Sequence, residues 1–280
     1  MATLEQQCLY NPDPARFVYH YTSADTAITH ILPSRKLRLS PYTKTNDPKE
    51  SKGWQFFTGT NENRSLDPYP VQKISEEMTF AFKANTKLFC SSIDGDLQGS
   101  HLDHINERGF THPRMWAQYG SNHRGVCFVL DKGDVSNAVR AVGGHEAILF
   151  CGAVKYCNRP VLPNFADSPY GINVDVLERI GQEAYIKQHL RYHVKRLFFE
   201  KARDWRDECE LRWVLFNSLK EYVYFDASAA IKGIVFGADC ADGDIAKIVE
   251  LSDERPTWFE QLVWKGCSPW YSFNHRWPRY

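Results

Sequence analysis

Residues 204–216 read DWRDECELRWVLF, and this stretch decides how the chain folds. From Cys209 onward its side chains alternate with the period of two that is typical of a β-strand. One predicted face is apolar and carries Cys209, Leu211, Trp213 and Leu215. The other face begins with two carboxylates and a guanidinium, from Glu208, Glu210 and Arg212, and continues with Val214 and Phe216.

The polar face of this strand has two interpretations. If it faces solvent it is an ordinary polar edge, which is the commoner case. If it faces a cleft, two acids roughly 6–7 Å apart, the spacing of residues i and i+2 in a strand, begin an active site. Because Val214 and Phe216 are apolar, this face becomes buried further along, and that favours the cleft.

The composition is that of a globular protein. Of 280 residues, 43% are hydrophobic and 24% are charged, which excludes a disordered chain. The 34 basic and 34 acidic residues give a formal net charge of zero, so the chain has no overall attraction for nucleic acid. We expect one α+β domain over residues 1–280, with a central, mostly antiparallel or mixed sheet and flanking helices.

The sequence predicts a cytoplasmic protein without a membrane partner. No apolar run reaches the roughly 18 residues that a membrane helix needs, and the first residues lack the basic and apolar regions of a signal peptide. The 8 cysteines include no C-x-x-C pair, so we expect no metal site.

Three segments away from the central stretch carry further expectations. Residues 1–15 are expected to be a loose N-terminal leader, and residues 257–280 an aromatic C-terminal tail that packs on the body. Residues 173–202 have the 3.6-residue period of one long helix. Its exposed face would carry a basic row, which is more often solvated than bound to phosphate: Lys187, Arg191, Lys195, Arg196 and Lys201.

Several common catalytic motifs are absent from the sequence. It contains no G-x-x-x-x-G-K-S/T phosphate loop, no G-x-G-x-x-G, no G-x-S-x-G and no H-E-x-x-H. These absences disfavour the common NTPases, Rossmann dehydrogenases, α/β-hydrolases and zinc proteases.

Short motifs that are present follow a recognisable order. They are YHYT at 19–22, NDP at 46–48, FCS at 89–91, MWAQY at 115–119, GVC at 125–127, and Trp205 with ECELR at 208–212. Together they resemble the bacterial family called domain of unknown function 2971, over about Arg16 to Gly237. The chain departs from that family at Lys49, where an apolar residue usually follows N-D-P. The family name implies no activity.

A second resemblance does imply one. The order of an early strand with His-x-Thr, a Tyr in a middle segment and a Glu on a late strand is similar to the His–Tyr–Glu arrangement of ADP-ribosyltransferases of the diphtheria-toxin and poly(ADP-ribose) polymerase type. The pair Glu208-x-Glu210 is also similar to the E-x-E of the arginine-modifying branch. The resemblance implies a split sheet of the ADP-ribosyltransferase type and NAD as substrate.

This resemblance assigns roles to individual residues. The catalytic set would be Glu210, Glu208, Tyr119 and His20. Glu210 would hold the 2′-hydroxyl of the nicotinamide ribose, Glu208 would orient or deprotonate an acceptor, and Tyr119 would stack on nicotinamide. NAD would be bound by His20, Tyr21, Thr22, Ser91, Trp116, Tyr119 and Arg212.

The chemistry suits these residue types. Breaking the nicotinamide–ribose bond passes through an oxocarbenium-like state, which a nearby carboxylate stabilises more than it does the ground state. The ADP-ribose would pass to an unknown acceptor, protein or nucleic acid, and family context suggests a toxin or a phage-defence effector.

Plainer interpretations and other functions stay open. His20 alone is more often a structural histidine, and Tyr119 a core aromatic. The two glutamates could form exposed pairs with Arg206 and Arg212, worth only ~0–1 kcal/mol each. The domain could instead be a non-catalytic sensor for a nucleotide or a partner. A metal-dependent nuclease that uses Glu208, Glu210 and Asp207 ranks last.

Overall fold

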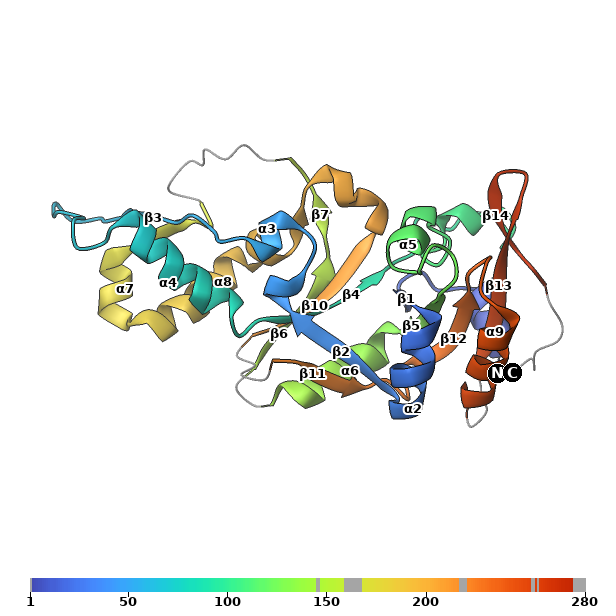
Figure 1. Ribbon diagram of the computed structural model, residues 1–280. Coiled ribbons are helices and arrows are strands. Elements are labelled where there is room, and N and C mark those ends of the chain that lie inside the picture. Colours follow the sequence, from blue (N-terminus) through green and yellow to red (C-terminus); the bar gives the residue numbers. More distant parts are fainter. Residues whose placement is uncertain are drawn as a thin grey trace.

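The computed structural model describes residues 2–144, 147–158, 168–216, 221–252, 255 and 257–273. Within this part of the chain the fold is α+β, as predicted, and is built on a ten-stranded sheet (Figure 1). Its strands are β1 (Phe17–Thr22), β2 (Lys36–Pro41), β4 (Lys87–Ser92), β5 (Val126–Asp131), β6 (Ile148–Ala153), β10 (Glu210–Phe216), β11 (Val223–Asp226), β12 (Ile231–Phe236), β13 (Trp258–Lys265) and β14 (Ser268–Tyr271).

The sheet is mostly antiparallel and it branches. The strand order is β11-β2-β4-β1-β5-β12-β13-β14, and β10 pairs with both β4 and β6. Neighbouring strands are antiparallel except β12 and β13, which are parallel. Two small parallel pairs lie apart from it: β3 (Phe57–Gly59) with β8 (Gly171–Asn173), and β7 (Lys155–Tyr156) with β9 (Glu200–Lys201).

The branch point is on β4. One edge of β4 pairs with β10 along its length. On the opposite edge, β2 pairs with the first two residues of β4, Lys87 and Leu88, whereas β1 pairs with the last, Ser92. The two strands therefore diverge and leave a fork beside residues 89–91. The fork opens in the middle of β4, at residues that pair with β10 on one edge but with neither β1 nor β2 on the other.

Strand β10 is buried on both faces. Leu211, Trp213 and Leu215 belong to one hydrophobic core, and Val214 and Phe216 to a second core on the opposite face. This confirms the predicted alternation. The prediction was wrong at its start, because β10 begins at Glu210 and Glu208 ends a 3-10 helix (Arg203–Glu208). Between them Cys209 has a φ of 44°, a left-handed conformation that interrupts the strand pattern.

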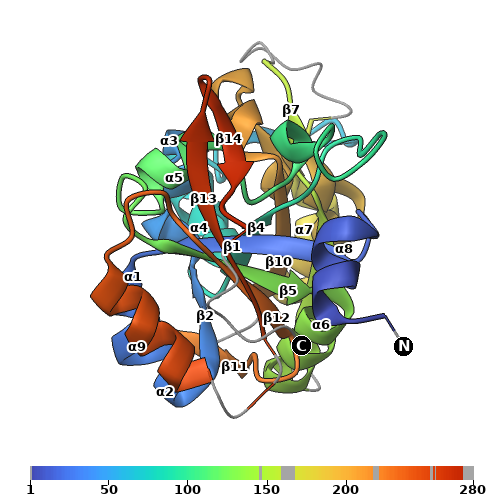
Figure 2. The ribbon, with the colours of Figure 1, turned by 90° about the vertical axis from the view of Figure 1, so that its right-hand side faces the viewer.

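Helices cover the first core from outside. They are α1 (Ala24–Thr26), α2 (Leu32–Ser34), α6 (Lys132–Gly143) and α9 (Asp242–Ser252). A π-helical turn, Ala27–Ile31, joins α1 to α2, and the Ser23 side chain caps α1 by accepting from the Thr26 N–H. Figure 2 shows α2 and α9 side by side, with α6 on the other side of the sheet strands.

The second core lies at the opposite end of the molecule. There α4 (Val71–Lys83), α7 (Val174–Ile180) and α8 (Gln182–Phe198) pack near β3, on the left in Figure 1. Two short helices lie nearer the sheet, α3 (Pro48–Ser51) and α5 (Pro113–Gln118). A third core joins α5 to β13 and β14 through buried aromatics such as Trp116, Trp258 and Tyr271.

The single helix expected over residues 173–202 is two helices and a strand. Asn173 caps α7, and Gly181, with φ 79° and ψ 161°, separates α7 from α8. Few residues other than glycine adopt this conformation, so the break is built into the sequence. The chain leaves the helix at Phe199, and Lys201 lies on β9 instead of on an exposed helical face.

The expectation for residues 1–15 is wrong, and the expectation for residues 257–280 can be compared with the structure only as far as Phe273. The segment 1–15, expected to be loose, contains a π-helical turn (Gln6–Tyr10) whose Cys8 and Leu9 are buried. In the segment 257–280, β13 and β14 form a hairpin on the sheet and Tyr271 is fully buried, whereas residues 274–280 lie outside the described part. Among the described helices none has the length and apolar character needed to cross a membrane.

Candidate active site

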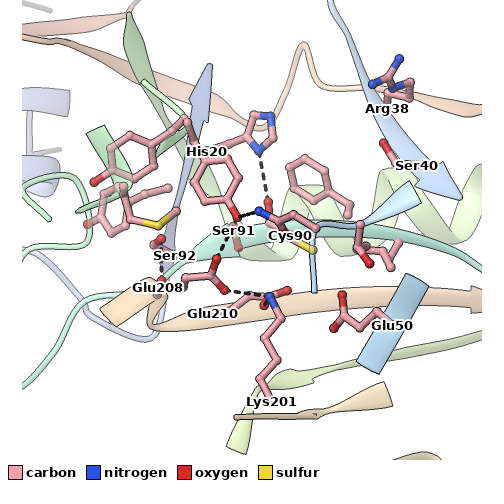
Figure 3. A pocket seen from close by; sticks show the side chains of 18 of the residues that line it. His20, Arg38, Ser40, Glu50, Cys90, Ser91, Ser92, Lys201, Glu208 and Glu210 are labelled. Atoms are coloured by element: carbon pink, nitrogen blue, oxygen red, sulfur yellow. Dashed lines mark hydrogen bonds and ion pairs between the residues drawn. The ribbon is translucent and has the colours of Figure 1, made fainter. Parts of the chain in front are cut away.

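A cavity of about 390 Å³ lies at the fork between β1 and β2. This volume is in the range of small-molecule sites. The residues of the β4 edge, from Leu88 to Ser92, line its floor, with Tyr19, His20 and Tyr21 of β1 on one side. Arg38 and Ser40 of β2 line the other side, and Lys201, Glu208 and Glu210 close one end. Figure 3 shows the labelled side chains of this cavity.

Lys201 joins the two glutamates. Its Nζ lies 2.7 Å from Glu208 Oε2 and 2.8 Å from Glu210 Oε2, and the three side chains are only 4–5% exposed. The short strand β9 brings Lys201 here, because β9 leaves the end of α8 and pairs with β7. The ammonium group thus holds both carboxylates at the end of the cavity (Figure 3).

Arg212 holds Glu210 from behind. Its Nε and one terminal nitrogen each donate to a different oxygen of Glu210 at 2.7 Å, which is the bidentate geometry. The other terminal nitrogen donates to Glu50 Oε1 at 2.6 Å and to the Phe198 carbonyl at 2.7 Å. Arg212 is fully buried, so these contacts satisfy a guanidinium that cannot reach the cavity.

The five side chains joined by these ion pairs form a buried charge cluster: Glu50, Lys201, Glu208, Glu210 and Arg212. Three carboxylates face two cations, so the cluster has one formal excess negative charge. Burial alone would raise the pKa of Glu210, but the Arg212 and Lys201 cations outweigh it and lower that pKa to about 2. Burial would lower the pKa of Lys201, but the carboxylates, Glu210 foremost, raise it above its usual range. Glu210 and Lys201 are therefore both charged at neutral pH.

Tyr119 is fixed against Glu208. Its hydroxyl donates to Glu208 Oε1 at 2.8 Å and accepts from the side-chain amide of Asn46 at 2.9 Å. Burial and then the Glu208 carboxylate raise the pKa of Tyr119, so the hydroxyl stays protonated and remains a donor. The ring lines the cavity in one orientation, with Met115 of α5 beside it.

At the fork, the His20 side chain contacts a backbone carbonyl of β4 that no neighbouring strand pairs with on that edge. Its Nδ1 lies 3.1 Å from the carbonyl oxygen of Cys90, and its ring packs on Phe89 with centroids 4.8 Å apart. Because a carbonyl can only accept, Nδ1 must carry a proton. Burial lowers the pKa of His20, so the ring is neutral and Nε2 is left as an acceptor. A ligand hydroxyl is the kind of donor that such a nitrogen binds.

The structure brings together six of the predicted site residues. His20, Tyr21, Ser91, Tyr119, Glu208 and Glu210 line the cavity. Thr22, Trp116 and Arg212 lie outside its lining. The Trp116 indole donates to the Phe110 carbonyl, and Trp116 is 1% exposed. The Arg212 guanidinium is fully engaged in contacts within the charge cluster and with the Phe198 carbonyl. These two side chains support the site from within the core.

Sequence reasoning missed several residues of the site. Lys201 was assigned to an exposed helical face, and Glu50, Asn46 and Arg38 were not singled out as site residues. Asn46 begins the N-D-P motif and Glu50 follows it closely, so this motif was a usable signal. For Lys201 the signal was weak, because β9 depends on pairing with the distant β7.

The acids in the cavity are not arranged around a metal position. The point between Glu208 and Glu210 is occupied by the Lys201 ammonium group. Asp207 lies outside the cavity lining and its exposed carboxylate pairs with Arg114 and Arg206. Among the described residues, no group of three or more His, Cys, Asp or Glu side chains is placed to bind a metal ion. The arrangement of these side chains does not support the nuclease alternative.

Comparison with known protein families gives a match over part of the chain. A family model described as a protein of unknown function (DUF2971) matches residues 115–213, which run from α5 into β10. The matched stretch includes Tyr119, Lys201, Glu208, Glu210 and Arg212. Over this part the predicted resemblance to the family is confirmed. Neither the curated proteins nor the solved structures contain a significant match to the chain. The resemblance to ADP-ribosyltransferases stays a prediction.

Proposed function

We propose that this cavity cleaves the nicotinamide–ribose bond of NAD and transfers the ADP-ribosyl group to an acceptor. The observation that carries the proposal is the buried charge cluster with one formal excess negative charge at the end of an aromatic-lined cavity. A site of this kind favours a ligand that becomes more positive at that end during reaction.

The energetics of the cluster favour a functional role. Burying ions costs several kcal/mol each, and replacing such networks by apolar residues is often neutral or stabilising. The buried charge cluster is therefore poorly explained by a contribution to stability. Its position at the end of a cavity is better explained by a role in function. In glycosidic cleavage, positive charge develops on the sugar ring, and fixed carboxylates stabilise that state without reorganising.

Glu208 is the better candidate for contact with the reacting sugar. Each of its oxygens accepts one contact, from Tyr119 and from Lys201. Glu210 accepts more, two contacts from Arg212, one from Lys201 and a further hydrogen bond from the Cys90 thiol. Each carboxylate has about four acceptor positions, so Glu208 keeps more capacity for a ribose hydroxyl. We therefore place Glu208 at the ribose. Glu210 would position the Lys201 ammonium group and add to the negative electrostatic potential at this end of the cavity.

The remaining side chains fit the same ligand. The Tyr119 ring is held in one orientation and can stack on the flat nicotinamide. His20 Nε2 can accept from a ribose hydroxyl. When the bond between nicotinamide nitrogen and ribose C1′ breaks, its electron pair leaves with nicotinamide, which becomes neutral. A nucleophilic oxygen or nitrogen of the acceptor then bonds to C1′, and its proton passes to Glu208 or to water.

The proposal is tested by nicotinamide release. Purified protein is incubated with NAD in EDTA, and nicotinamide is quantified by chromatography, first alone and then with cell lysate as a source of acceptors. Release in either arm supports glycosidic cleavage, and labelled NAD shows whether water, protein or nucleic acid receives the ADP-ribose. No release in both arms, from protein shown to be folded, would overturn the transferase proposal.

A binding module without turnover is the second candidate. The observation that favours it is that both oxygens of Glu208 and of Glu210 already accept hydrogen bonds in the free protein. Such acids could simply recognise a ligand. Thermal stabilisation by NAD without any nicotinamide release would support this candidate.

A further inference from the structure

The cavity is electrically polarised from one end to the other. Glu208 and Glu210 lie at one end, whereas β2 and the turn after it bring Arg38, Ser40 and Lys44 to the other. Figure 3 shows Arg38 and Ser40 across the cavity from the two glutamates, with His20 and Cys90 between them. A ligand that spans this distance meets two carboxylates with the Lys201 ammonium group at one end, and the two cations Arg38 and Lys44 at the other.

The Arg38 guanidinium is available at the mouth of the cavity. It lies over the ring of Tyr222, 4.8 Å from the centroid, and the side chain is exposed. No carboxylate of the described residues lies within ion-pair distance of it. Arginine presents a planar fork of donors that matches two phosphate oxygens, so an exposed guanidinium beside a cavity suits a phosphate group.

Lys44 can bind the same phosphate as Arg38, because breaking its present ion pair with Glu221 costs little free energy. Its Nζ lies 2.7 Å from Glu221 Oε1 and 2.7 Å from the Tyr222 hydroxyl, and both charged side chains are more than half exposed. Exposed pairs of this kind contribute only ~0–1 kcal/mol. A phosphate at the mouth of the cavity can therefore replace Glu221 as the partner of Lys44.

We propose that Arg38 and Lys44 form an anion subsite that binds the 5′-phosphate of the nucleotide whose ribose lies at His20 and Glu208. This deepens the proposed function and rests on it for the identity of the sugar. The subsite makes the cavity specific for phosphorylated nucleosides, such as nicotinamide mononucleotide or NAD, over the unphosphorylated riboside. The order of groups in such a ligand is base, ribose and phosphate, and it matches Tyr119, His20 with Glu208, and Arg38.

The test compares binding of matched ligands by calorimetry to the full chain. ADP-ribose carries the diphosphate, ribose carries the sugar alone, and inorganic pyrophosphate carries the anion alone. Arg38→Gln is expected to weaken ADP-ribose binding about 10- to 100-fold, the effect of losing hydrogen bonds to a charged group, and to make it less sensitive to salt. Lys36→Gln is the matched control, because Lys36 is exposed on the same strand but lies outside the cavity lining.

Each outcome bears on the proposal separately from catalysis. Equal loss in both variants, or no loss in Arg38→Gln, would overturn the subsite. Pyrophosphate that binds as tightly as ADP-ribose would overturn the assignment to a nucleotide. Arg38-dependent binding of ADP-ribose in a protein that releases no nicotinamide would support the subsite while the cleavage proposal fails. Nicotinamide release by Arg38→Gln with an unchanged KM for NAD would overturn the subsite while cleavage stands.

Discussion

Arg212 is the residue on which the other buried charges depend. It contacts Glu210 through two nitrogens and Glu50 through a third, with its whole side chain out of solvent. Without it, Lys201 would be the one cation left for the three carboxylates of the charge cluster. At the scale of single residues, Arg212 therefore makes it possible for Glu210 to stay ionised beside an aromatic cavity, because its guanidinium is the foremost cause of the lowered pKa of Glu210.

Arg212→Met tests this dependence. The change leaves Glu210 and Glu50 without their main partner, and removing one member of a buried ion pair costs about 3–5 kcal/mol. We expect a loss of that order in the free energy of unfolding, measured by urea denaturation. The control is Arg206→Met on the preceding turn, where an arginine whose side chain is 71% exposed should change stability by no more than about 0.5 kcal/mol. Similar losses in the two variants would contradict the role given to Arg212.

The low pKa of Glu210 makes a prediction about acid. Its pKa falls from the ordinary 4.5 to about 2 in the folded protein. The unfolded state therefore binds the proton more readily, so this contribution to stability is fully present above pH 4.5 and is lost as the pH falls toward 2. Urea midpoints measured from neutral pH down to acid should fall more steeply for wild type than for Glu210→Gln. Parallel curves for the two proteins would show that Glu210 contributes nothing to the acid sensitivity.

At the scale of elements, short segments place the site residues. The four-residue helix α3 carries Glu50, and its start is capped by the Asp47 carboxylate, which accepts from the Lys49 N–H. Lys83 of α4 donates to the carbonyls of Lys49, Glu50 and Lys52. Neither helix length nor periodicity identifies α3 as part of a site. Helix α3 contributes to the site because the Lys83 contacts fix its position, and Glu50 can then accept from Arg212.

The break between α7 and α8 is the element-scale feature that a substitution can test. Gly181 has a positive φ with an extended ψ, a combination that costs other residues about 1–3 kcal/mol, and a methyl group added at its Cα would meet no atom within 4 Å. Gly181→Ala should therefore destabilise through backbone strain alone. Gly243→Ala in α9 is the control, since that glycine also has open space but no positive φ, and a gain of about 0.4–1 kcal/mol is expected.

Thermal or urea unfolding of the two glycine variants tests whether Gly181 sets the break between α7 and α8. A stable Gly181→Ala protein would mean that α7 and α8 join into the single helix that the hydrophobic period predicts. Loss of stability in that variant, with a gain in Gly243→Ala, would confirm that the break is set by the backbone conformation of one residue.

At the scale of the whole molecule, local patterns predicted the fold class and part of the site. The alternation in β10 is a property of neighbouring residues, so the sequence was enough to place Leu211 and Trp213 on one face and Glu210 on the other. The fork of the sheet and strand β9 depend on pairing between distant segments, which a local period does not encode. For that reason Lys201 and Arg38 were missed, although Glu208, Tyr119 and His20 were found.

We propose that the cavity at the fork is a reaction centre with Glu208 at its sugar-binding end. This role of Glu208 is tested by the rate of nicotinamide release from NAD by wild type, Glu208→Gln and Asp207→Asn at equal concentrations of folded protein. Asp207 is the control, because its carboxylate is adjacent in sequence but 57% exposed and outside the cavity lining. We predict that Asp207→Asn matches wild type and that Glu208→Gln loses about 10²–10³ in rate while it still binds NAD. Release by Glu208→Gln at the wild-type rate would overturn the proposed role of Glu208.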